Sequence, residues 1–291
     1  MDYSDRCLIE VRNISHTYFA GTPLAVSALR NVSIEVHENE AVGIIGPAGS
    51  GKSTLLQHLN GLLRPEQGEV YIEGSPLSEM TDEITGVRQR VGLVFQMPEK
   101  QLFKQYAGDD IAFGPINLGL SSQEVRRRVK KAMHMTGLPF SFKDRLTQEL
   151  SQGEKRLLAL SGVLAMEPQV LVLDEPTANL DPQGRKQILS ILKNWARRAK
   201  RAVVLASHSM EDIAELCTRV YVIADGRVVT EGESREVFSN YTLLEQNGLS
   251  LTVPGRVMRG LIQNGFRVDA GVVSYENAAQ QIRGLLNAWK V

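Results

Sequence analysis

A glycine-rich segment near the start of the chain has the spacing of a phosphate-binding loop. It matches the pattern G-x-x-x-x-G-K-S/T and lies between an aliphatic stretch and a leucine-rich one, the strand-loop-helix context that the pattern requires. Glycines let backbone N–H groups approach phosphate oxygens, and the following helix adds partial positive charge. We expect Lys52 to contact the β- and γ-phosphates of a nucleotide and Ser53 to contact Mg²⁺. The segment comprises Gly46, Pro47, Ala48, Gly49, Ser50, Gly51, Lys52, Ser53 and the next residue, Thr54.

Two adjacent acids follow a second aliphatic stretch. Val170–Leu173 suits a strand that is buried on both faces, and Asp174 and Glu175 come directly after it. Sheets of α/β proteins place ligands at the carboxyl ends of their strands, so these acids should lie beside the loop. Asp174 would hold Mg²⁺, directly or through water, and Glu175 would be the general base for an attacking water. The two acids could instead cap a following helix, but the phosphate-binding loop disfavours that interpretation.

Two other polar residues follow strand-like stretches. His208 comes soon after Ala202–Ala206, where it could contact the γ-phosphate or orient the water, although such a histidine is more often structural. Gln96 follows Val91–Phe95 and could reach Mg²⁺ or the water, a weak signal by itself. The remaining histidines have no comparable placement, and we interpret them as structural: His16, His37, His58 and His134.

The strands and helices that should position these residues form an alternating α/β pattern. A strand followed by a glycine loop and a helix is the beginning of a parallel sheet. Strands are predicted at Leu8–Val11, Val32–Val36, Ala41–Ile45, Glu69–Ile72, Val170–Leu173, Ala202–Ala206, Val220–Ile223 and Arg227–Thr230, the last two joined by a hairpin turn at Asp225-Gly226. Helices are predicted at Ser53–Leu63, Gln123–Gly137, Ser151–Met166 and Gln183–Lys200. The basic residues of the second helix are interpreted as a solvated face. Short amphipathic helices after Gly232 suggest two domains, 1–233 and 234–291.

Composition narrows the class of protein. The chain has 291 residues, 43% hydrophobic and 23% charged, which is ordinary for a globular protein with a core that needs no disulfide or metal. The 33 basic and 33 acidic residues balance, which disfavours a nucleic-acid binder that relies on bulk positive charge. Cys7 and Cys217 have no metal-binding spacing and are expected to be reduced thiols of a cytosolic protein. The start of the chain lacks the layout of a signal peptide, and no stretch approaches a spanning helix, so a partner must supply any link to a membrane.

The order of these motifs resembles that of an ABC-type ATPase subunit. Leu150–Glu154 is similar to the family signature LSGGQ, keeping Ser151 and Gly153 but departing at Gln152 and Glu154. Ala178–Asp181 matches another family segment, and Tyr18 matches the aromatic residue that stacks on adenine, although it could equally be a packed surface residue. The resemblance implies an α/β P-loop NTPase fold. This fold has a RecA-like core, an antiparallel β subdomain and a helical subdomain at about 97–165, followed here by the small C-terminal domain.

Two longer segments, Phe95–Phe103 and Asp110–Gly119, are similar to the ATPases of energy-coupling factor (ECF) vitamin transporters and their cobalt and nickel relatives. Three others resemble the second of the two ECF ATPase types: Gly21–Pro23, Leu55–Gly61 and Gly162–Pro168. The resemblance is strong over Leu8–Gly232 and looser over Leu243–Gly260.

The resemblance implies ATP and Mg²⁺ as ligands and a dimer with two composite ATP sites. In the family, the signature serine and glycine contact the γ-phosphate held by the other subunit, which assigns Ser151 and Gly153, and with them Asp181, to a nucleotide across the interface. The implied partners are a second ATPase, identical or related, an integral membrane scaffold and a small substrate-binding membrane protein for a vitamin or metal ion, with no nucleic acid. The implied location is the cytoplasmic face of the membrane, and the C-terminal domain would help the ATPases associate.

Two other function classes agree less well with the sequence. A non-transport ABC ATPase acting on ribosomes or DNA would commonly carry two ATPase halves or long coiled-coil inserts, and the chain has neither. A regulatory module that binds ATP without hydrolysis would be expected to lose Glu175 or His208, and both are present.

Two segments give more specific expectations. Glu154 should face away from the partner's phosphates and bond Lys155, Arg156 or the backbone, which leaves the site competent. Residues 96–113 should meet the membrane partner, because their apolar side chains exceed what a plain loop needs, although these could instead pack beneath the helical subdomain. The apolar residues are Leu102, Phe103, Ile111 and Phe113.

Overall fold

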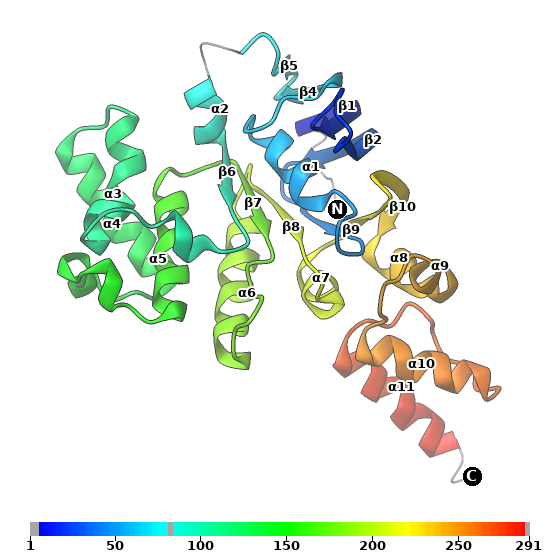
Figure 1. Ribbon diagram of the computed structural model, residues 1–291. Coiled ribbons are helices and arrows are strands. Elements are labelled where there is room, and N and C mark those ends of the chain that lie inside the picture. The colour runs from blue at the N-terminus through cyan, green and yellow to red at the C-terminus, as the bar shows by residue number, and fades with distance from the viewer. Residues whose placement is uncertain (1–5, 81–83, 289–291) are drawn as a thin grey trace.

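A six-stranded sheet forms the centre of the molecule. The computed structural model describes residues 6–80 and 84–288, so the outermost ends of both predicted domains lie outside it (Figure 1). The strand order is β10-β9-β3-β8-β7-β6, and all neighbours are parallel except the β9–β10 hairpin. The strands are β3 (Ala41–Ile45), β6 (Val91–Val94), β7 (Val170–Asp174), β8 (Ala202–Ala206), β9 (Arg219–Ala224) and β10 (Arg227–Glu233). Every residue of β3, β7 and β8 is buried, as expected for strands covered on both faces.

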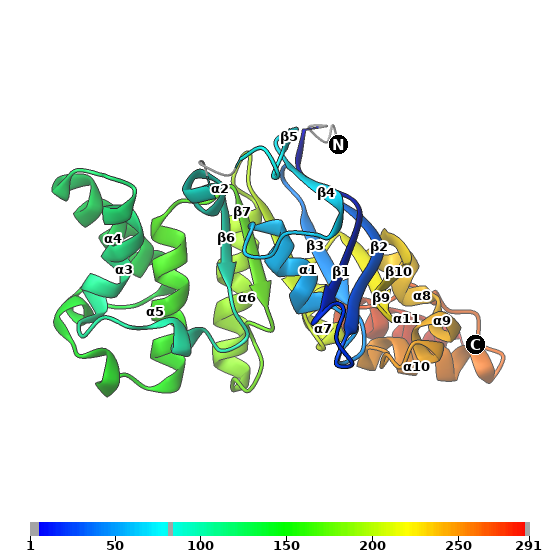
Figure 2. The same ribbon diagram turned by 45° about the horizontal axis from the view of Figure 1, so that its top comes forward.

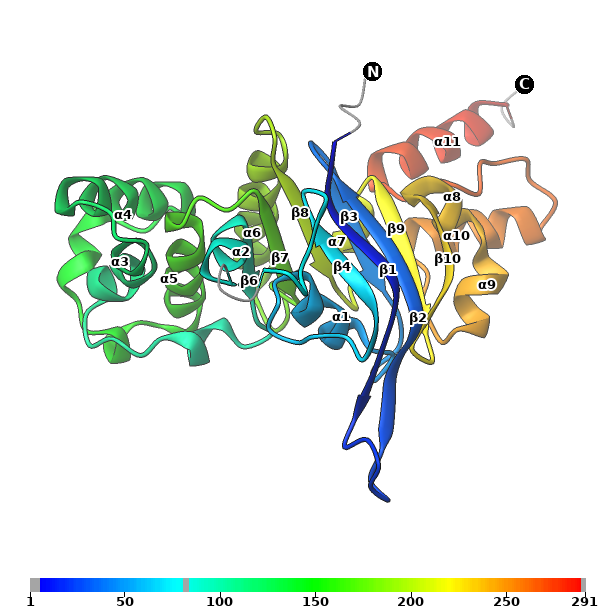
Figure 3. The same ribbon diagram turned by 90° about the horizontal axis from the view of Figure 1, so that it is seen from above.

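A second, antiparallel sheet has the order β2-β1-β4-β5. Its strands are β1 (Cys7–Tyr18), β2 (Val26–His37), β4 (Gln67–Ile72) and β5 (Ser75–Pro76). The predicted limits of the first two strands, Val11 and Val32, are wrong, because both strands continue through Asn13 and Asn31. These asparagines have φ values of 52° and 53° at register shifts of the β1–β2 pair, which breaks the alternation of apolar residues. The hairpin of β1 and β2, longer than predicted, projects beyond the rest of the chain (Figure 3).

Helix α1 (Lys52–Leu59) follows β3 and leads to β4 of the antiparallel sheet, whereas α6 (Pro182–Ala196) and α7 (Met210–Leu216) connect strands of the large sheet. The predicted helix at 53–63 ends early, because Asn60 caps α1 and Gly61 has a φ of 69°, which a helix does not allow. The predicted helix at 183–200 likewise stops at Ala196, and α7 was not predicted.

A helical region lies at one side of the large sheet, next to β6 (Figures 1 and 2). It contains α3 (Ala107–Asn117), α4 (Ser122–Thr136) and α5 (Gln152–Ala165), with the 3₁₀ helices η1 (Pro98–Gln101), η2 (Phe140–Asp144) and η3 (Thr147–Glu149), while α2 (Ile84–Arg90) precedes β6. The basic residues of α4 are mostly exposed, in agreement with a solvated face. Helix α3 was not predicted.

The C-terminal segment is helical, as predicted, and lies at the opposite side of the sheet (Figure 2). It contains α8 (Ser234–Ser239), α9 (Tyr241–Gln246), α10 (Val253–Gln263) and α11 (Tyr275–Ala288). Its first part packs into the main core through Phe238 and Leu244, whereas Met258, Val272 and Ala278 form a small cluster of their own. Within residues 6–80 and 84–288, no helix is long and apolar enough to cross a membrane.

Candidate functional site

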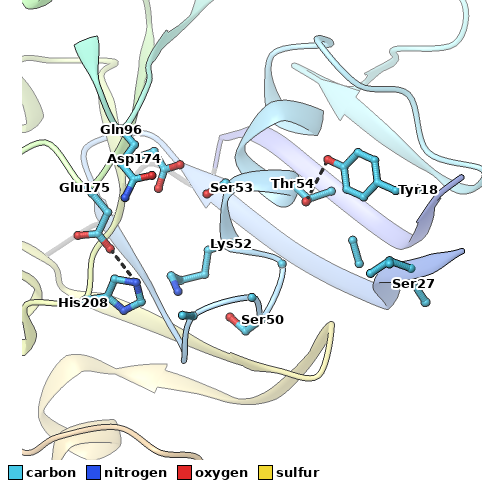
Figure 4. A pocket seen from close by; sticks show the side chains of 15 residues that line it. Tyr18, Ser27, Ser50, Lys52, Ser53, Thr54, Gln96, Asp174, Glu175 and His208 are labelled. Carbon is cyan, nitrogen blue, oxygen red and sulfur yellow. Dashed lines mark hydrogen bonds and ion pairs between the residues drawn. The ribbon is translucent and has the colours of Figure 1, made fainter. Parts of the chain in front are cut away.

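A cavity of about 390 Å³ opens at the carboxyl ends of the parallel strands (Figure 4). It collects most of the residues that the sequence motifs singled out, from five separate segments of the chain. The lining residues are Tyr18, Val26, Ser27, Ala28, Ala48, Gly49, Ser50, Gly51, Lys52, Ser53, Thr54, Gln96, Asp174, Glu175 and His208. Gly46 and Pro47 do not line it, but they contact it through Lys52.

The glycine-rich loop is shaped by close backbone contacts. A Cβ at Gly46 would lie 2.1 Å from the Ile223 carbonyl oxygen, and one at Gly51, where φ is 103°, would lie 2.4 Å from the Ala28 carbonyl oxygen. Neither position can accept a side chain. The Lys52 ammonium is buried and donates hydrogen bonds to the carbonyl oxygens of Gly46 (2.8 Å) and Pro47 (2.9 Å). This burial lowers the pKa of Lys52, while Glu175 and Asp174 act in the opposite direction.

Asp174 and Glu175 end β7 on the loop side of the sheet. The Glu175 backbone is in the left-handed region with a φ of 49°, an unusual conformation for this residue that re-aims the chain at the strand end. Its Oε1 lies 3.6 Å from Nε2 of His208, and its Oε2 accepts a hydrogen bond from the Ser207 hydroxyl at 3.4 Å. Burial raises the pKa of Glu175, and the adjacent Asp174 carboxylate adds to this effect. A carboxylate that holds protons more tightly is better matched to accepting one from water.

His208 is half exposed at the end of β8 and points to Glu175 (Figure 4). Burial is the main cause that lowers its pKa, and the nearby Lys52 ammonium adds to it. The imidazole is therefore neutral at pH 7 and retains one ring N–H donor.

Oxygen donors suited to Mg²⁺ border the same cavity. The Ser53 hydroxyl, the Gln96 amide and the Asp174 carboxylate all line it. Hard oxygen donors are what Mg²⁺ prefers, and it usually takes one or two carboxylates and completes its shell with phosphate oxygens and water. The described residues contain no group of three or more His, Cys, Asp or Glu side chains that could hold a metal ion. This donor set fits Mg²⁺ bound together with a nucleotide.

Tyr18 lies at the rim of the cavity, where its hydroxyl is 3.3 Å from the Thr54 hydroxyl. Its ring packs edge-on against His16 at a centroid distance of 4.7 Å. The β2 residues Val26, Ser27 and Ala28 also line this rim. Sequence analysis missed them, because the strand was predicted to begin only at Val32.

The signature residues lie elsewhere. Ser151 and Gly153 are exposed at the start of α5, and Gly153 and Asp181 line a second cavity of about 250 Å³ between α5 and α6. Asp181 also caps α6, accepting a hydrogen bond from the Gly184 N–H at 2.6 Å. Within one chain, these three residues therefore do not meet the loop cavity.

Glu154 bonds the backbone, one of the three partners expected for it. Its Oε2 accepts a hydrogen bond from the Ser151 N–H at 2.7 Å, and Oε1 lies 3.7 Å from the Arg145 guanidinium. The backbone bond is the main cause that lowers the pKa of Glu154.

The β9–β10 turn helps to hold the glycine-rich loop in place, a role that was not predicted from the sequence. The Gly226 N–H donates to the Ser50 carbonyl oxygen at 3.2 Å, and the Gly226 carbonyl accepts from the Arg30 N–H at 2.7 Å. A Cβ on Gly226 would lie 2.8 Å from the Ala28 carbonyl oxygen. The Asp225-Gly226 signal in the sequence indicated a turn, but not that the turn holds the glycine-rich loop.

Residues 96–113 divide between surface and core. Phe103 and Phe113 are 60% and 37% exposed and pack edge to face at 4.7 Å. The expectation for Ile111 is wrong, because this side chain is fully buried in the main core, and Leu102 packs against that core.

Comparison with known proteins adds independent evidence. Residues 29–178 match the ABC transporter family. Over 283 residues the chain is 44% identical to the energy-coupling factor transporter ATP-binding protein EcfA2 of Clostridium acetobutylicum, covering 97% of this chain and 99% of that protein. The structure of cbiO1 from Clostridium perfringens, part of the ABC transporter complex cbiONQ, has a TM-score of 0.73 and 34% identity, covering 88% of this chain and 100% of that one. The dimeric ATP-binding cassette MJ0796, bound to ADP and Pi in a post-hydrolysis state, has a TM-score of 0.71 and 30% identity, covering 78% and 98%.

Proposed function

The chain belongs to the ABC transporter family, among the ATP-binding proteins of energy-coupling factor transporters, and from this membership we propose how its residues bind and hydrolyse ATP. It is an ATPase subunit that couples hydrolysis to transport by an ECF importer. The relatives do not favour the alternative of an ABC ATPase acting on ribosomes or DNA. The observation that carries the residue assignment is the convergence of Lys52, Asp174, Glu175 and His208 on one cavity.

In this proposal, ATP lies with its base against Tyr18 and its phosphates in the glycine-rich loop. Lys52 exchanges the Gly46 and Pro47 carbonyls for phosphate oxygens, and backbone N–H groups of the loop hold the remaining charge. Ser53, Gln96 and Asp174 hold Mg²⁺, which neutralises charge on the phosphates when bound. Glu175 accepts the proton of the attacking water, and the neutral His208 donates a hydrogen bond to the γ-phosphate.

The complete site requires a second ATPase, identical or related to this chain. Ser151 and Gly153 lie outside their own loop cavity but are exposed at a helix N-terminus, a position that favours an anion. We assign them, with Asp181, to the nucleotide held by the partner ATPase. The C-terminal segment from Ser234 would help the two ATPases associate.

The remaining partners lie in the membrane. We assign the exposed part of residues 96–113, centred on Phe103 and Phe113, to contact with an integral membrane scaffold. A small substrate-binding membrane protein would carry the vitamin or transition-metal ion, and no residue of this chain reads that cargo. The chain would then sit at the cytoplasmic face of the membrane.

Glu175→Gln tests the central assignment. Glutamine preserves the shape of the side chain but cannot accept the proton, so turnover should fall by at least about a hundredfold while ATP stays bound. The measurement is phosphate release together with equilibrium binding of ATP. Unchanged turnover would remove Glu175 as the base, and Ser207→Ala, which removes only a neighbouring hydrogen bond, serves as a milder control.

A further inference from the structure

Arg156, near the start of α5, is a buried cation that touches two distant segments at once. Its Nη1 donates hydrogen bonds to the carbonyl oxygens of Pro176 (3.3 Å) and Ala178. Its Nη2 lies 3.8 Å from Oε2 of Glu99. The Arg156 side chain is only 9% exposed, so these groups rather than bulk water compensate its charge.

The two carbonyl acceptors belong to the loop that connects Glu175 with Asp181. On the other side of this loop, the Thr177 hydroxyl donates a hydrogen bond to the buried carboxylate of Asp212 in α7. The loop is therefore held from α5 on one side and from α7 on the other. Because a guanidinium presents its donors in a rigid, planar arrangement, the position of α5 fixes the position of this loop.

Glu99 lies in η1, three residues after Gln96 and four before Phe103, and η1 packs against α5. Its Oε2 is buried and has no hydrogen-bond partner in the part of the chain that the structure describes. The 3.8 Å separation from Arg156 exceeds the length of a charge-assisted hydrogen bond, about 2.7–2.9 Å. A shift of η1 toward α5 by about 1 Å would close this pair into such a bond.

We propose that Arg156 is a positioning residue that couples docking at η1 to the loop following Glu175. A partner that presses η1 onto α5 closes the Glu99–Arg156 pair, and the same guanidinium then orders the Pro176 and Ala178 carbonyls. Arg156 does not line the nucleotide cavity of its own chain, although it borders the second cavity beside Gly153 and Asp181, and we assign its effect to the loop that its guanidinium contacts. The inference rests on the proposed docking role of residues 96–113.

The test compares ATP hydrolysis by the ATPase subunits alone with hydrolysis by the full complex, solubilised with its membrane partners. Glu99→Gln should lower the ratio of the two rates about tenfold, the fold-change expected for one hydrogen bond between charged groups. Arg156→Lys keeps the charge but loses the planar donor arrangement, so kcat of the complex should fall while KM for ATP changes little. The double variant should lower the rate ratio no further than Arg156→Lys does, because both substitutions break the same connection between η1 and the loop.

Arg128→Lys is the matched control. Arg128 Nη1 also faces two backbone carbonyls, those of Ala165 (3.5 Å) and Met166 (3.3 Å), but at the other end of α5. In this variant the ratio of hydrolysis by the complex to hydrolysis by the isolated subunits should equal that of the wild type. A general loosening of α5 would lower the ratio in this variant as well. A wild-type ratio in Glu99→Gln, or effects of the two substitutions that simply multiply, would overturn the coupling role while leaving docking intact. A complex that assembles normally with Phe103→Ala would instead refute the docking assignment, so the two failures are distinguishable.

Discussion

Replacing Glu154 by glutamine tests whether the altered signature segment leaves the composite site competent. Glu154 and Ser151 form a reciprocal capping box, in which the Glu154 carboxylate accepts from the Ser151 N–H and the Ser151 hydroxyl accepts from the Glu154 N–H at 3.3 Å. These bonds lower the pKa of Glu154, so it is ionised at neutral pH. They also direct the carboxylate to the backbone at the start of its own helix.

The expected magnitude is small. A glutamine can still accept the Ser151 hydrogen bond, but it loses the favourable charge at the helix N-terminus, about 0.3–1 kcal/mol. This lowers Tm by about 1–3 °C for a chain of this size. The side chain is 31% exposed and lies 3.7 Å from Arg145, so water and that guanidinium screen its field at the partner's phosphates. An exposed charge interaction of at most about 1 kcal/mol corresponds to a change in turnover below about fivefold.

The assay is ATP turnover of the assembled complex at saturating ATP, together with thermal unfolding. Glu124→Gln is the control, because Glu124 occupies the same position in α4, where Ser121 caps its N–H at 3.3 Å, far from the nucleotide cavity. Because Glu124 also pairs with Arg127 and Arg128, this variant should lower Tm by at least as much, and it should leave turnover unchanged. A rise in turnover above about tenfold in Glu154→Gln alone would refute the reasoning. Such a rise would mean that the carboxylate faces the partner's phosphates and inhibits the wild-type site.

Two further predictions concern the surface and the core. Phe103→Ala, which truncates a side chain that is 60% exposed, should weaken assembly with the membrane partner more than ATP binding; a collapse of nucleotide affinity measured by titration would show that Phe103 supports the fold instead. His58 is buried with its Nδ1–H donating to the Thr54 carbonyl at 2.7 Å, and burial lowers its pKa to about 4. Because the unfolded state binds this proton with a pKa of about 6.5, the free energy of unfolding should be unaffected above that pH, fall by up to about 3 kcal/mol toward pH 4 and then level off. Urea titrations of His58→Phe should lack this fall, and an equal fall in that variant would contradict the assignment.

The parts of the site at strand ends were predictable from the sequence, because a buried parallel strand has a plain aliphatic signature. Asp174, His208 and Gln96 each follow such a run, and their convergence requires only that the strands share one sheet. The order β3-β8-β7-β6 was not readable, because aliphatic runs carry no information about which strands are neighbours. The rim at Ser27 was missed for a local reason, since the polar outer half of β2 does not alternate cleanly.

Helix α3 shows a different reason for failure. Its sequence contains Gly108, Gly114 and Pro115, which disfavour a helix in isolation. In the folded chain, a Cβ on Gly108 would lie 2.9 Å from Lys143, and one on Gly114 would lie 2.8 Å from Met166. The glycines therefore permit close packing against neighbouring segments, and tertiary contacts override the poor helix propensity. Periodicity likewise could not separate the exposed Phe103 from the buried Ile111, which lie in the same segment, residues 96–113.

The two sides of α5 explain how one helix could serve both halves of a composite site. Its exposed start presents Ser151 outward, where in the proposed dimer the partner's nucleotide lies. Its buried side directs Arg156 inward to the carbonyls beside Glu175 of its own chain. Because a helix is stiff along its axis, a movement that brings Ser151 to one nucleotide also displaces the loop that serves the other. Closure at one composite site would then be transmitted to the general base of the second site by the backbone of α5 and a single guanidinium.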